Sequence, residues 1–169
     1  ARLGEKIRAA LQVLHERLRE ECRLVTLAAP EGFDPDKFQL VRGEHLEHHP
    51  YQYLDYPKHF QDGCTFTFRT LVWWGHHVVC AWLLEGARLE LYKRHVLSRY
   101  QELAGRGIEL GIAPGLWEWK VGEGYTLPLK PANRSQVAAV LERRPCMKLC
   151  CVIPPDDPAL AEGRLPQLG

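Results

Sequence analysis

Large flat side chains and polar groups that could orient a ligand gather in two segments of this chain. They are Trp74, His76 and His77 in the first segment and Trp117, Glu118 and Trp119 in the second. Indole rings hold planar ligands through contact area, while imidazole and carboxylate groups fix orientation by hydrogen bonding. We therefore expect a small molecule or a partner protein to bind these residues. Packing in the core is the other explanation for the tryptophans.

Glu118 and Lys120 stand two residues apart, so on a strand their side chains would project to one face. A carboxylate and an ammonium in that arrangement can hold Mg²⁺ and stabilise charge on a phosphate. The pair resembles half of the PD-(D/E)xK nuclease pattern, which implies a metal-dependent phosphodiesterase with Asp62 or a histidine completing the metal shell. Asp62 stands in a Gln-Asp-Gly turn without the usual context of that family. Hydrolysis is therefore the alternative to binding, and a solvated Glu–Lys pair is the ordinary explanation.

His45 and His49 would point the same way if the segment 43–50 formed a turn of helix, and two imidazoles that share a zinc ion need that geometry. No third ligand stands at a diagnostic spacing. We expect a solvated loop there and no cofactor. The six cysteines are expected to be small apolar residues, because none has a clear activating neighbour in the sequence.

The composition indicates one globular domain, since 46% of the 169 residues are hydrophobic and 25% are charged. We place this domain at residues 1–153 and a Pro- and Gly-rich tail at 154–169. A net charge of +1 gives no field that would gather nucleic acid, which we do not expect as a partner. The N-terminal residues lack the apolar core of a signal peptide, and no apolar run is long enough to span a membrane. We expect a cytoplasmic, reduced protein.

Three helices are predicted, at about 4–22, 87–104 and 134–144. The first has an apolar stripe of Ile7, Leu11, Leu14 and Leu18, which suits docking on a sheet and also suits a dimer contact. We expect a homodimer or larger assembly that uses this helix. The second helix carries several cations but should cover the sheet and hide its aromatic side chains.

A β-hairpin over about 64–85 is the strongest strand signal. If Gly75 and His76 form a two-residue turn, Trp74 lies opposite His77 and Arg69 lies opposite Trp82. Both faces are mostly apolar, so we expect this hairpin to be central and covered on both sides. Further strands are predicted at 37–42, 51–56, 116–121 and 147–153. The fold class is α+β, with a mixed sheet of four to six strands.

Overall fold

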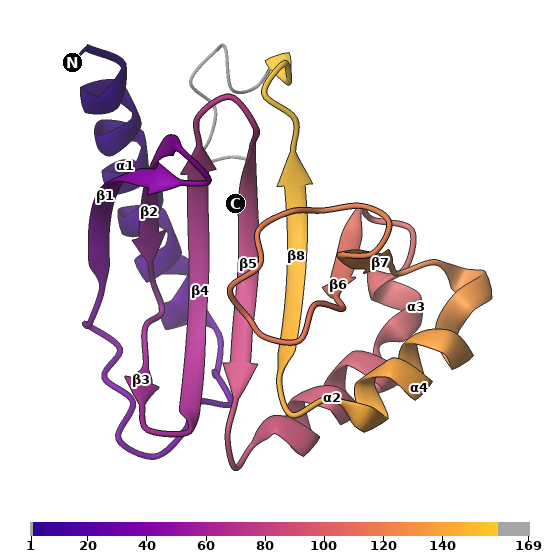
Figure 1. Ribbon diagram of the computed structural model, residues 1–169. Coiled ribbons are helices and arrows are strands. Elements are labelled where there is room, and N and C mark those ends of the chain that lie inside the picture. The colour runs from indigo at the N-terminus through magenta and orange to yellow at the C-terminus, as the bar shows by residue number, and fades with distance from the viewer. Residues whose placement is uncertain (1, 159–169) are drawn as a thin grey trace.

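The computed structural model describes residues 2–158, which form a single sheet and five helical segments (Figure 1). The strands are β1 (Gln39–Leu46), β2 (His49–Asp55), β3 (Phe60–Gln61), β4 (Cys64–Trp73), β5 (His77–Glu85), β6 (Ile108–Gly111), β7 (Thr126–Pro128) and β8 (Met147–Ile153). They lie in the order β1-β2-β4-β5-β8-β6-β7, and β3 pairs with β4. The α+β class is confirmed. The sheet has eight strands, however, and every described pair is antiparallel, so the expected mixed sheet of four to six strands is replaced by a larger antiparallel one.

The helices agree with the predicted ranges. They are α1 (Arg2–Leu24), α2 (Leu89–Ser98), α3 (Tyr100–Leu103), the 3-10 helix η1 (Pro131–Asn133) and α4 (Arg134–Arg143). The apolar stripe of α1 places Leu11 and Leu14 at 0% and 1% exposure. Because these leucines pack on the sheet, α1 is a docking helix.

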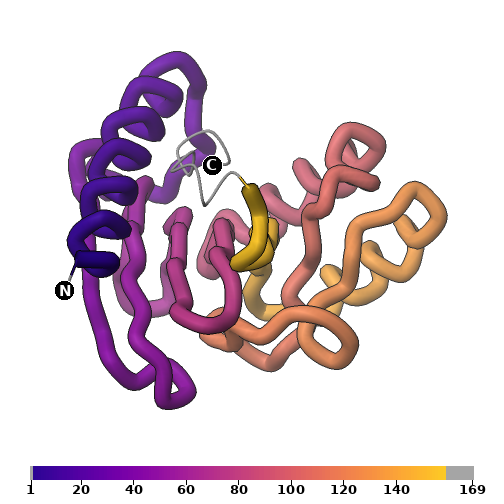
Figure 2. Tube along the Cα trace, turned by 90° about the horizontal axis from the view of Figure 1, so that it is seen from above, coloured from indigo at the N-terminus to yellow at the C-terminus, as the bar shows by residue number. Residues whose placement is uncertain are grey.

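All the helices pack on the same face of the sheet. One cluster joins Leu11 and Leu14 of α1 to Leu54, Val78, Cys80 and Ile153. A second cluster joins Tyr92, Val96, Tyr100, Val137 and Leu141 of the later helices to Phe66, Leu84 and Met147. The strand residues in these two clusters share one phase of the alternation along β4, β5 and β8. The hairpin is covered on both sides as expected, but helices cover only one face, and the loop that carries Leu116 and Trp119 covers the other. Figure 2 shows α1 and the β6–β7 loop, residues 112–125, on opposite sides of the sheet.

The β4–β5 hairpin differs from the prediction by one residue in register. Trp73 pairs with His77, so the turn contains three residues, with Gly75 at a φ of 74°. Arg69 consequently lies opposite Ala81 and not opposite Trp82. A shift of one residue exchanges the two faces of a strand relative to its partner. Leu71 and Trp73 therefore share a face with His77 and Val79, which the two-residue turn would have separated.

Two further predictions are corrected. Residues 43–50 form neither a solvated loop nor the turn of helix that a shared zinc site would need, but the end of a β1–β2 hairpin in which Glu47 and His48 make the turn. His45 and His49 accordingly stand on different strands. Residues 116–121 were expected to be a strand, but they belong to the irregular β6–β7 loop. β6 itself lies in a segment for which no strand was predicted.

Part of the predicted tail at 154–169 lies outside the described residues, so the division of the chain at residue 153 stays a prediction. Within residues 2–158, no helix combines the length and the apolar character that crossing a membrane would require.

Candidate functional site

The helix-free face of the sheet carries its own apolar cluster. Its buried members are Leu71, Trp73, Val79, Ala81, Leu83, Leu116, Trp119, Cys146 and Cys150. Leu116 and Trp119 come from the β6–β7 loop, and their side chains are only 3% and 6% exposed. The loop is therefore anchored on this face through two apolar side chains, although it forms no strand there.

Side chains from the sheet and from the α4–β8 connection also hold the β6–β7 loop through its backbone carbonyls. His77 Nε2 lies 3.1 Å from the carbonyl oxygen of Trp119, and Lys148 Nζ donates to the carbonyl oxygen of Glu118. Arg144 donates to the carbonyl oxygen of Ile112 at 3.1 Å. Burial lowers the pKa of His77, which favours the neutral ring whose Nε2–H can donate to Trp119. These contacts satisfy carbonyl groups that strand pairing would otherwise satisfy.

The end of the β1–β2 hairpin covers the same face beside the loop. The indole nitrogen of Trp73 donates to the carbonyl oxygen of Leu46 at 3.0 Å. The two covering segments then meet where Lys120 Nζ lies 3.0 Å from a carboxylate oxygen of Glu47. Because both side chains of this ion pair are partly exposed, the contact joins the segments at the surface and contributes little free energy.

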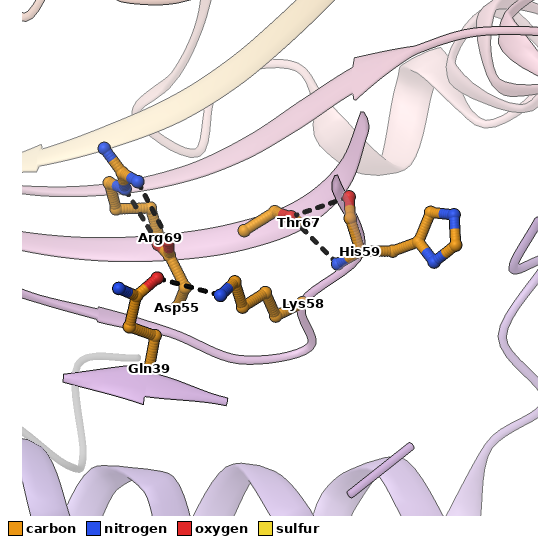
Figure 3. A network of polar contacts seen from close by, with 6 residues as sticks. All are labelled: Gln39, Asp55, Lys58, His59, Thr67 and Arg69. Carbon is orange, nitrogen blue, oxygen red and sulfur yellow. Dashed lines mark hydrogen bonds and ion pairs between the residues drawn. The ribbon is translucent and has the colours of Figure 1, made fainter. Parts of the chain in front are cut away.

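A buried ion pair lies beneath these segments. Arg69 donates to both carboxylate oxygens of Asp55 at 2.8 Å, and Asp55 is fully buried (Figure 3). The guanidinium carbon of Arg69 lies 3.7 Å from the ring centre of Tyr53 and 5.3 Å from that of Trp117. The bidentate geometry fixes the guanidinium plane, so the aromatic rings stack on a group that cannot turn freely.

Lys148 is a second buried cation on this face. Its side-chain nitrogen lies 3.8 Å from the ring centre of Trp119, and the residue is 5% exposed. Burial lowers the pKa of Lys148 from 10.5 to about 8. Among the described residues, no carboxylate oxygen lies within ion-pair distance of this nitrogen. Lys148 contacts the backbone carbonyl oxygen of Glu118, but the carboxylate of the same residue accepts a hydrogen bond from the backbone nitrogen of Lys120.

Trp117 is the exposed member of the aromatic group. Trp117 is 53% exposed to solvent, and its ring centre lies 6.0 Å from the ring centre of Phe60. On the other side of Arg69, the rings of Tyr53 and Tyr51 are parallel, with centres 6.1 Å apart. A row of flat side chains therefore runs across the helix-free face from Tyr51 to Phe60.

The structure brings together part of the predicted binding set. His77 contacts the backbone of Trp119, so the hairpin end and the loop that carries Trp117 and Glu118 lie side by side. His76 stacks on Trp73 with ring centres 3.9 Å apart, in the turn of the hairpin. Trp74 lies in the same turn, half-buried, and its backbone nitrogen donates to the carbonyl oxygen of Pro50 at 3.0 Å.

The residues of the hydrolase alternative are engaged differently. Lys120 pairs with Glu47, and hydrogen bonding to that carboxylate raises the pKa of Lys120. Asp62 is exposed in the β3–β4 turn. Residues 2–158 contain no group of three or more His, Cys, Asp or Glu side chains arranged to hold a metal ion.

Sequence reasoning missed Lys148 and Asp55. A signal for one of them was present, because Lys148 is the single charged residue in the apolar run Met147–Ile153. A cation inside a strand that must be buried needs a partner or a function.

The chain matches no protein-family model, and no curated protein or solved structure is significantly similar to it.

Proposed function

We propose that this protein is a binding domain that holds a small molecule, or a segment of a partner protein, on the helix-free face beside the β6–β7 loop. The observation that carries the proposal is the half-exposed indole of Trp117, 53% exposed, next to the guanidinium of Arg69. A single exposed aromatic side chain is ordinary on a protein surface. This one belongs to a row of rings and is held beside a buried ion pair.

The arrangement favours binding because the contact surface is already rigid. Asp55 fixes Arg69, and Arg69 in turn limits the positions that Tyr53 and Trp117 can take. A ligand that stacks on such a surface loses less free energy to the ordering of side chains than one that binds a mobile surface. His77 lies on the same face, and His76 stacks on Trp73 there, so both would contact a ligand that extends from Trp117 toward the hairpin turn that also holds Trp74.

The proposal is tested with two planar probes, adenosine for a small molecule and N-acetyltyrosinamide for an aromatic side chain of a partner. Correlation spectra of the five indole N–H groups report which tryptophan each probe approaches. We expect the signals of Trp117 and Trp119 to move, and Trp117→Ala to remove the effect. Trp82→Phe is the control, because Trp82 packs against Phe66 among the helix-side residues. Shifts centred on Trp82, shifts that survive Trp117→Ala, or no shift with either probe at millimolar concentration would contradict the proposal.

The metal-dependent phosphodiesterase stays an alternative prediction with its own test. If Glu118 is a ligand, calorimetric titration with Mg²⁺ or Mn²⁺ should show binding that Glu118→Ala abolishes. Binding that Glu118→Ala leaves intact, or no binding, would count against it.

Assembly through α1 also stays a prediction, with a narrower surface than the sequence indicated. Leu11 and Leu14 are buried against the sheet, so a contact between copies would use the exposed Leu3, Val13 and Leu24.

A further inference from the structure

The two buried lysines of this protein differ in their partners. Lys93 and Lys148 are both 5% exposed. Lys93 Nζ lies 3.1 Å from a carboxylate oxygen of Glu90 and donates to the carbonyl oxygen of Arg144 at 2.7 Å. Lys148 Nζ donates only to the carbonyl oxygen of Glu118 among the described residues, and it lies against the ring of Trp119. An ammonium group has three donors, so Lys148 retains donors and a full positive charge without an anion.

The buried ammonium group of Lys148 destabilises the folded protein unless an anion pairs with it. Burying an ammonium without a counter-ion opposes folding, and an apolar side chain of similar size would avoid that cost. Arg69 does not provide compensation, because it is also cationic and lowers the pKa of Lys148. The fully paired Asp55 neutralises Arg69, so the deeply buried groups Asp55, Arg69 and Lys148 carry one uncompensated positive charge. Glu118 and Glu109 are half-buried at the margin. The charge of Glu118 raises the pKa of Lys148, but its carboxylate makes no ion pair with the ammonium group, and Glu109 accepts a hydrogen bond from Thr126.

We propose that Lys148 is the anion-binding residue of this site, and that the ligand is a planar compound bearing a carboxylate or a phosphate. The inference rests on the proposed function and adds the charge of the ligand to it. The ligand oxygen takes the place of the Glu118 carbonyl oxygen as the acceptor from Lys148. A hydrogen bond between two charged groups is shorter and stronger than one to a neutral carbonyl, so the exchange is favourable.

The geometry links the anion to the stacking surface. Lys148 Nζ lies 3.8 Å from the ring centre of Trp119, and Trp117 stands two residues away in the same loop. An acid group at Lys148 therefore leaves its attached ring beside the indoles of the loop.

The β6–β7 loop is built so that its central residues can make room. Its base is fixed, because Ile112 and Tyr125 are joined by a backbone hydrogen bond of 2.9 Å. Its centre, around Glu118, has no strand partner among the described residues and is held by side chains alone. A shift confined to the carbonyl group of Glu118 therefore breaks its hydrogen bond with Lys148, leaves the sheet intact and keeps the anchors Leu116 and Trp119 buried.

The test uses pairs of probes that differ in charge, namely benzoate with benzamide, and adenosine monophosphate with adenosine. On the full chain at pH 7, we expect at least one acid to bind about tenfold more tightly than its uncharged counterpart. Lys148→Met should reduce that ratio to about one, while Lys148→Arg, which keeps the charge, should retain part of it. The preference should also fall at pH 9.5, where the free amine predominates. The pair that shows the preference distinguishes a carboxylate ligand from a phosphate ligand.

Lys93→Met is the matched control, because it removes an equally buried lysine from α2, and it should leave the ratio unchanged. Thermal unfolding of each variant confirms that it is folded. Binding that depends on Trp117 but shows no preference for the acid would overturn this inference and leave the proposed function standing. Failure of all four probes to bind would overturn this inference, and the proposed function would fall with it only if N-acetyltyrosinamide also failed to bind. A preference that survives Lys148→Met would assign the anion to another residue.

Discussion

Two cations on the helix-free face have opposite effects on stability. Arg69 is paired with the fully buried Asp55, so removing either partner would leave an uncompensated charge, at a cost of about 3–5 kcal/mol. Lys148 has no carboxylate partner among the described residues, so removing it relieves a cost. Arg69 thus makes the surface rigid, while the unpaired Lys148 costs stability and is the residue that we propose binds an anion.

The cost of burying Lys148 predicts a characteristic dependence on pH. Its pKa is about 8 in the folded protein against 10.5 for the free group. Between these values the unfolded chain binds a proton that the folded chain does not, so stability rises with pH across that range. Lys148→Met should therefore be more stable than the wild type at pH 7, by up to about 3 kcal/mol, and the difference should close as the pH approaches 10.

Urea denaturation of both proteins from pH 7 to pH 10 measures this difference. Charge effects elsewhere in the chain are common to the two proteins and cancel in the comparison. A constant difference across the pH range would show that Lys148 keeps an ordinary pKa.

At the level of elements, the sequence predicts local structure well and the partners of each segment poorly. The apolar stripe of α1 and the long apolar run of β4 and β5 are strong periodic signals, and both elements form. The register of the hairpin was wrong because Trp73 and Trp74 are equally apolar and both faces of the hairpin are buried. Where neither face is polar, the pattern cannot choose between adjacent registers.

The segment around Trp117 shows the same limit for the candidate site. Its alternation of large and charged residues is typical of a strand, yet it lies across the sheet and not within it. Trp119 is buried against the sheet, whereas Trp117 is half-exposed to solvent. The sequence pattern therefore reflects burial on one side of an irregular segment and not pairing with a neighbouring strand. The contact of Lys148 with this segment joins residues 30 positions apart, and no local pattern encodes it.

The turn of the β1–β2 hairpin carries a testable strain. Glu47 and His48 have φ values of 49° and 68°, in the left-handed region that side chains with a β-carbon disfavour. Two-residue hairpin turns of this kind usually contain glycine. His48→Gly should therefore stabilise the protein by roughly 1 kcal/mol, while Glu47 keeps its contact with Lys120.

His45→Gly provides the comparison, because His45 is also exposed but lies within β1. There glycine should destabilise by about 0.5–1 kcal/mol. Denaturation midpoints at equal slope measure both changes. Equal effects of the two substitutions would mean that the turn stores no strain.

For the whole molecule, the main asymmetry is that the helices occupy one face of the sheet and leave the other to loops. The helix-bearing face is covered in two separate parts, by α1 on one side and by α2, α3 and α4 on the other. The core is thus divided, and the helix-free face is covered by the β6–β7 loop and the end of the β1–β2 hairpin in place of helices. The net charge of +1 is consistent with a site whose charge is local.

The role of α1 as a docking helix is tested by two adjacent residues. Leu14 is 1% exposed and Val13 is 48% exposed. Leu14→Ala should cost about 3 kcal/mol through lost burial and the cavity that remains. Val13→Ala should change stability by less than about 0.5 kcal/mol.

The unfolding midpoints should not depend on protein concentration if α1 serves only its own chain. If Val13→Ala weakens the fold, and does so more at high protein concentration, then α1 also joins two copies of the chain.

The order of the strands has a consequence for synthesis. β8 is synthesised after β5 and β6, yet it lies between them in the interior of the sheet. Until residues 147–153 emerge from the exit tunnel, β5 and β6 each carry an edge that β8 will later pair with. Nascent chains with open edges pair readily with one another. A chaperone that shields those edges would therefore help this protein more than it would help a protein whose strands pair in the order in which they are synthesised.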